Sequence, residues 1–87
     1  MPPPREKARH KQVLLVLLRE VRRQAGLRQV DVAKLLGKPQ SFVSNYESGE
    51  RRLDVLELRK VCEVTGVDLG QFVRRLEAAL RKVAAER

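Results

Sequence analysis

A short polar stretch after Pro39 carries the residues of this sequence that are best suited to recognise another molecule. Four of them are neutral groups that can donate and accept hydrogen bonds: Gln40, Ser41, Ser44 and Asn45. If residues 40–47 are helical, these four lie on one face, because an α-helix turns once in 3.6 residues. Such a face suits the reading of base edges in duplex DNA, where Gln or Asn can pair with adenine through two hydrogen bonds. The alternative is a merely solvated face, but such faces usually carry Lys and Glu.

Basic residues flank this polar stretch on both sides. The chain has nineteen Lys and Arg against eleven Asp and Glu, a net charge of +8. This balance attracts polyanions, of which nucleic acid is the commonest, although anionic membranes attract it as well. We expect contacts to DNA phosphates, which fix register rather than sequence, from four of these residues: Arg28, Lys38, Arg51 and Arg52.

Other kinds of site find little support in the composition. Cys62 and His10 are the single cysteine and histidine, so neither a disulfide framework nor a zinc set is expected. No nucleophile, base and orienting group can be assembled, so we expect no enzyme, metal or cofactor. The longest apolar run, residues 13–18, is far shorter than the roughly 20 residues that span a bilayer. A reducing, cytoplasmic compartment is expected.

The periodicity of apolar residues predicts an all-α chain of five helices and no strand. Residues 1–10 are expected to form a flexible basic tail, because three prolines open them, and residues 11–87 a single domain. Three residues, 37–39, join the second and third helices, which must therefore meet at a steep angle. The expected helices are 11–25, 29–36, 40–47, one from Asp54 to just before Gly66, and one from Asp68 past Val83.

Four spaced segments carry a family resemblance: residues 24–29, 32–37, 40–47 and 48–52. They resemble the Cro and lambda-repressor type of helix-turn-helix protein, also called the xenobiotic-response-element (XRE) type. The resemblance implies a five-helix domain, a homodimer, and a prokaryotic or phage source with association to the nucleoid. It also implies that the third helix lies in the major groove of operator DNA.

The resemblance assigns roles residue by residue. It implies that Gln40, Ser41 and Asn45 contact base edges, with Ser44 beside them. Gln29, at the start of the second helix, would grip a phosphate. Arg22 and Glu47 would form a buried ion pair.

The sequence departs from the family pattern at the helix caps and at one aromatic residue. Arg28 and Pro39 replace residues with a capping oxygen before the second and third helices. Phe42 stands where a small polar residue is common, and we expect it to pack on Tyr46 four residues later rather than to contact a thymine methyl group.

The last helix has more apolar residues than a minimal domain needs. Excess apolar surface usually marks an interface, so a homodimer through this helix, aided by the start of the first, is one hypothesis. The alternative is that the two helices cover each other within one chain. The predicted interface residues are Phe72, Leu76, Leu80 and Val83.

These observations favour a sequence-specific regulator of transcription, a repressor that binds an inverted-repeat operator in double-stranded DNA. The alternative is an interaction protein, such as an antitoxin, that binds both DNA and a partner enzyme. A membrane-surface or RNA-binding bundle is disfavoured, because affinity for lipid or phosphate alone needs only Lys and Arg.

Overall fold

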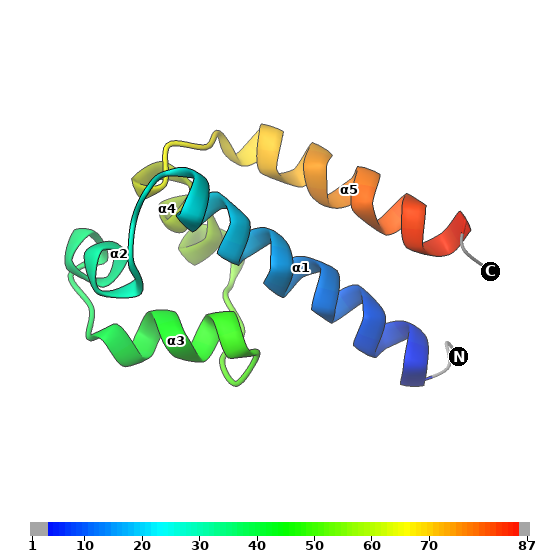
Figure 1. The fold of residues 1–87 in the computed structure, drawn as a ribbon, viewed down its shortest axis with the longest axis horizontal. Coiled ribbons are helices and arrows are strands. Elements are labelled where there is room, and N and C mark those ends of the chain that lie inside the picture. The colour runs from blue at the N-terminus through cyan, green and yellow to red at the C-terminus, as the bar shows by residue number, and fades with distance from the viewer. Residues whose placement is uncertain (1–3, 86–87) are drawn as a thin grey trace.

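The computed structural model describes residues 4–85, which contain five α-helices and no strand (Figure 1). This confirms the predicted all-α, five-helix class. The helices are α1 (Pro4–Gln24), α2 (Gln29–Leu36), α3 (Gln40–Ser48), α4 (Val55–Val64) and α5 (Leu69–Ala85). None of these described helices is both long enough and apolar enough to cross a membrane.

The first helix is longer than the sequence pattern predicted. It begins at Pro4 rather than near residue 11, so the expectation of a tail is wrong for residues 4–10, while residues 1–3 lie outside the described range. Proline is tolerated in the first turn of a helix, where its missing N–H has no partner to lose. The next five residues, 5–9, are Arg, Glu, Lys, Ala and Arg, all of which favour helix.

The steep joint between α2 and α3 follows from local signals. Gly37 ends α2 with a left-handed backbone (φ 68°), and the N–H of Lys38 donates to the carbonyl of Ala33. Glycine adopts this conformation without the steric penalty that other residues incur. Pro39 then takes an extended conformation and α3 begins at Gln40. Figure 1 shows α2 almost end-on while α3 lies along the page.

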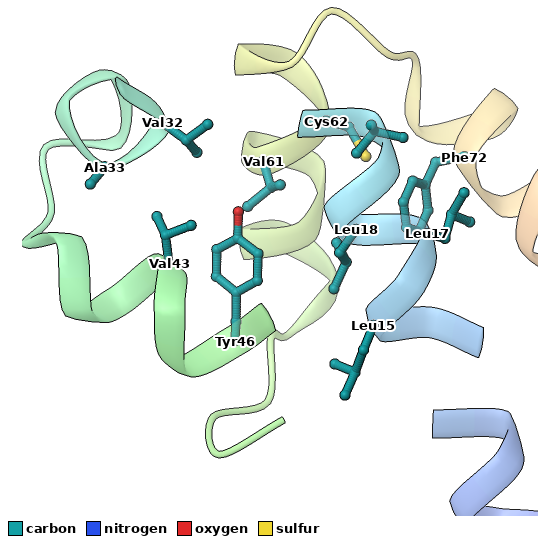
Figure 2. Packing of buried hydrophobic residues seen from close by; sticks show 11 residues of the cluster. Leu15, Leu17, Leu18, Val32, Ala33, Val43, Tyr46, Val61, Cys62 and Phe72 are labelled. Atoms are coloured by element: carbon teal, nitrogen blue, oxygen red, sulfur yellow. The ribbon is translucent and has the colours of Figure 1, made fainter. Parts of the chain in front are cut away.

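The core lies where α1 crosses the bundle formed by α2, α3 and α4 (Figure 2). Val43 and Tyr46 point from α3 into this core and are 0% and 1% exposed. Val21 of α1 and Val61 of α4 meet them, and Phe72 fixes α5 to the same cluster. Burial of the inner face of α3 therefore fixes its opposite face toward solvent.

Candidate nucleic-acid interface

The polar face of α3 is open to solvent in the way its spacing predicted. Gln40 and Ser41 are exposed, whereas Ser44 and Asn45 are partly exposed. The Ser44 hydroxyl donates to the carbonyl of Ser41 at 3.2 Å, and Ser48 donates to Asn45 in the same manner. The Ser44 oxygen therefore keeps its capacity to accept, while its proton is used within the helix.

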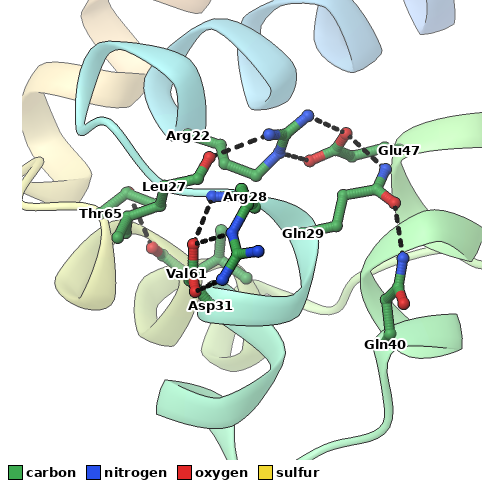
Figure 3. A network of polar contacts seen from close by, with 9 residues as sticks. All are labelled: Arg22, Leu27, Arg28, Gln29, Asp31, Gln40, Glu47, Val61 and Thr65. Atoms are coloured by element: carbon green, nitrogen blue, oxygen red, sulfur yellow. Dashed lines mark hydrogen bonds and ion pairs between the residues drawn. The ribbon is translucent and has the colours of Figure 1, made fainter.

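A chain of polar contacts links the first of these residues to the interior (Figure 3). The Gln40 amide donates to the side-chain carbonyl of Gln29 at 3.5 Å, and the Gln29 amide donates to Glu47 at 3.1 Å. Glu47 accepts two further bonds from the Arg22 guanidinium, at 2.6 and 3.0 Å. Gln29, at the start of α2, therefore links Gln40, the first residue of α3, to the buried carboxylate of Glu47.

The ion pair between Arg22 and Glu47 is largely withdrawn from water. Their side chains are 11% and 3% exposed, and Arg22 also donates to the carbonyl of Leu27 at 3.0 Å. The hydrogen bonds to the Glu47 carboxylate raise the pKa of Arg22 above its ordinary value, although burial opposes this change. The pair that the family resemblance implied is thus present, and Gln29 completes its set of contacts.

The ring of Phe42 packs against Tyr46 and against two cationic side chains beside α3. Its ring meets Tyr46 edge-on at 5.8 Å, which confirms the expected packing. The Arg51 guanidinium lies over the ring, 4.5 Å from the centroid, and the Lys38 ammonium lies 5.6 Å from it. Such cation–π contacts hold charge in place beside the polar face.

Two of the arginines expected to bind phosphate form ion pairs with carboxylates of the same chain. Arg51 donates to both carboxylate oxygens of Glu57, at 3.1 and 2.7 Å, and Arg28 donates to both oxygens of Asp31 at 3.0 Å. The Arg51 guanidinium, helped by the N–H of Asp54, lowers the pKa of Glu57 to about 2. The side chain of Arg28, helped by its own N–H, lowers the pKa of Asp31.

These carboxylates were not predicted from the sequence as part of the site. Asp31 stands three residues after Arg28, a spacing at which helical side chains meet, so this pairing could have been foreseen. Asp31 also accepts from the backbone N–H of Arg28 at 2.8 Å, which partly replaces the missing cap of α2. Glu57 also forms a capping box with Asp54, in which each side chain accepts from the backbone N–H of the other residue, but no local signal in the sequence indicates its pairing with Arg51.

The remaining cations expected at phosphates, Lys38 and Arg52, are exposed near the two ends of α3. Within the range 4–85, neither forms an ion pair. Together with Arg28 and Arg51 they frame the polar face.

The residues expected at a dimer interface divide into two groups. Phe72 is 0% exposed and belongs to the core of the single chain, so its prediction as an interface residue is wrong. Leu76, Leu80 and Val83 are partly exposed and line two grooves between α1 and α5. The first and last helices do pack on each other within one chain, but they leave these grooves uncovered.

A steeply joined helix pair, with a polar face on the second helix and the first helix fixed to it, defines a helix-turn-helix domain. The sequence comparisons agree, since residues 18–72 match the helix-turn-helix family. The chain belongs to this family, in its XRE branch.

The chain is similar to several solved structures. An XRE-family like protein from Pseudomonas syringae pv. tomato str. DC3000 is 46% identical, with a TM-score of 0.77 over 83% of this chain and 88% of that one. The clp gene regulator ClgR from Corynebacterium glutamicum is 19% identical, with a TM-score of 0.76 over 88% of this chain and 82% of that one, and shares the fold. No curated protein matches the sequence significantly.

Proposed function

We propose that this protein is a sequence-specific DNA-binding regulator of transcription that places α3 in the major groove of double-stranded DNA. The observation that carries the proposal is the solvent-facing row of neutral hydrogen-bonding groups on α3, framed by cations. Neutral amides and hydroxyls discriminate between base edges, whereas the cations supply affinity that does not depend on sequence.

The contacts of the site suggest a division of roles. Gln40, Ser41, Ser44 and Asn45 would read bases. Gln29 holds Gln40 in place and, at the start of α2, would also bind a phosphate, since helix N-termini attract anions.

The four cations would bind phosphates in two different ways. Lys38 and Arg52 could do so directly. Arg28 and Arg51 would have to exchange a carboxylate for a phosphate, and they would therefore contribute less affinity than unpaired arginines.

We propose further that two copies bind an inverted repeat and that operator occupancy represses transcription. In support, a groove of about 410 Å³ between α1 and α5 exposes apolar surface that a second copy could cover, including Val13, Val16 and Val83. Of the predicted interface residues, Val83 lines this groove, whereas Leu76 and Leu80 line the other groove. A two-fold pair would set its two α3 helices about 34 Å apart, one turn of DNA.

Selection of bound sites from random duplex DNA tests the central proposal, and the expected result is an enriched inverted repeat. Gln40→Ala should then relax the preference at one base position. Arg52→Ala should weaken binding to every sequence and lower the slope of log K against log salt by about one. Absence of an enriched motif, or equal effects of the two variants, would contradict the assigned roles.

Sedimentation tests the dimer. Val16, which is 40% exposed in the groove, is replaced by Gln, and Leu56, which is 74% exposed on α4, is replaced by Gln as a matched control. Val16→Gln should shift the protein toward monomer and Leu56→Gln should not. A wild-type monomer at micromolar concentration, both free and on its operator, would refute the dimer.

A further inference from the structure

A second and larger groove opens on the opposite face of α1. It has a volume of about 510 Å³ and lies between α1, the loop after α3, and α5. Its wall consists mainly of leucines, among them Leu14, Leu53, Leu58 and Leu76. Both its size and its apolar lining are typical of small-molecule sites, which measure about 300–1,000 Å³. None of the four base-reading residues lines it.

The mouth of this apolar groove is basic. Among the described residues that line it, every charged side chain is a cation: Lys7, Lys11, Arg51 and Arg52. His10 also lines the groove. In the part of the chain covered by the structure, Lys7, Lys11 and Arg52 take part in no ion pair. An apolar wall with a cationic rim complements a molecule with an alkyl chain and an anionic head.

Lys11 fixes part of this rim next to the DNA-facing helix. Its Cε and Nζ atoms lie 3.0 and 3.3 Å from the place where a side chain on Gly49 would begin. Gly49 directly follows α3 and precedes the loop that bears Arg51 and Arg52. The basic rim thus spans from α1 to the end of α3.

The charged residues at the two grooves differ, and they favour different binding partners. The dimer groove is lined by charges of both signs, Glu20 together with Arg9 and Lys82. Two identical copies of this surface can therefore meet with opposite charges side by side. The second groove is rimmed by cations only, in a chain of net charge +8, so a second copy would meet repulsion there while an anion would be attracted.

We propose that the second groove binds a free medium-chain fatty acid, with its alkyl chain against the leucines and its carboxylate among Lys7, Lys11 and Arg52. The regulatory consequence rests on the proposed function: Arg51 and Arg52 are candidate phosphate contacts, so a bound carboxylate competes with the DNA backbone. Fatty acid binding then lowers the affinity of the protein for DNA.

Calorimetry with the intact chain tests binding, with sodium decanoate below its micelle concentration as the probe. Extending the chain from hexanoate to octanoate to decanoate should tighten binding by up to about fourfold for each buried methylene. Decanol should bind more weakly than decanoate, and decyltrimethylammonium should not bind. No binding of decanoate, or equal binding of the cationic amphiphile, would overturn the proposal.

A pair of matched double variants tests the rim. Lys7→Gln with Lys11→Gln should weaken decanoate binding by about tenfold or more, as expected for lost hydrogen bonds to a charged group, and leave decanol unaffected. Arg23→Gln with Lys60→Gln removes the same charge from exposed positions outside the groove and should retain decanoate affinity. Equal loss in both variants would overturn the assignment of the carboxylate site.

DNA titrations with and without decanoate separate this proposal from the proposed function. A chain that binds decanoate but no DNA refutes the proposed function and supports the groove. Decanoate binding that leaves the affinity for DNA unchanged refutes the competition. Failure of decanoate to bind, together with loss of solvent exposure of the groove when the chain dimerises, would assign the groove to a second copy and overturn the proposal.

Discussion

Replacement of Glu47 by Leu should strongly destabilise the fold. The carboxylate accepts three hydrogen bonds, two from Arg22 and one from Gln29, and it is 3% exposed. Leucine has a similar volume but no acceptor, so Arg22 would keep its charge at 11% exposure with the carbonyl of Leu27 as its remaining protein acceptor in the described range. Loss of one partner from a buried pair costs about 3–5 kcal/mol.

This cost is large for a chain of 87 residues. At about 0.05–0.15 kcal/mol per residue, the total free energy of unfolding would be about 4–13 kcal/mol. Since 1 kcal/mol shifts the melting temperature of such a domain by about 4–8 °C, Glu47→Leu should lower it by about 12 °C or more. Urea and thermal unfolding followed by circular dichroism measure both quantities.

Two further variants test the physical reason. Glu63→Gln breaks the exposed pair with Lys60, whose charged atoms lie 3.6 Å apart, and should change stability by no more than about 0.5 kcal/mol. Arg22→Met combined with Glu47→Leu removes both charges and should recover most of the stability lost in Glu47→Leu, because no unpaired charge is left buried. If the double variant is as unstable as Glu47→Leu, the explanation by an uncompensated charge is refuted.

Three other predictions concern single side chains. The Tyr46 hydroxyl is buried without a hydrogen-bond partner in the described chain, so Tyr46→Phe should be neutral or gain about 1 kcal/mol in urea unfolding; a clear loss would reveal a partner, such as a bound water. Because Arg51 lowers the pKa of Glu57 to about 2 from an ordinary 4.5, their pairing stabilises the fold above pH 4.5 and less as pH falls toward 2. Glu57→Gln should therefore flatten the dependence of the urea midpoint on pH in that window, and an unchanged slope would contradict the pairing. Gly49→Ala should cost about 1–2 kcal/mol for its left-handed backbone plus the cost of moving the Leu15 and Lys11 side chains, which lie 3.0 Å from the Cβ position. Gly37→Ala, with open space at its Cβ position, should show the backbone cost alone; equal losses would argue against the close approach.

Local signals in the sequence were sufficient to place the central helices. The left-handed Gly37 and the capping box of Asp54 and Glu57 define where α2 ends and α4 begins, and both work through residues within a few positions of each other. The start of α1 was misjudged for the opposite reason. Three prolines suggested an irregular tail, but a proline in a first turn does not prevent a helix, and the residues after it favour one.

Contacts between distant residues could not be derived from periodicity. Gln29 and Glu47 are 18 positions apart, and their bond depends on how α2 and α3 cross. The pairing of Arg51 with Glu57 depends likewise on the path of the loop between α3 and α4. The burial of Phe72 could not be separated from exposure at an interface, because an apolar stripe looks the same whether its own chain or a second one covers it.

Because few residues of α5 are buried, we expect this helix to unfold locally before the other helices. Helices α1 and α5 extend to the same end of the molecule (Figure 1), and within Leu69–Ala85 only Phe72 is fully buried. Segments with few buried contacts open at the lowest free energy. Amide hydrogen exchange should therefore be fastest in the last turns of α5 and slow down toward Phe72, while α2 and α3 stay protected until the whole domain unfolds. The helix pair α2 and α3, with the exposed polar face of α3, would thus remain folded after the last helix has opened.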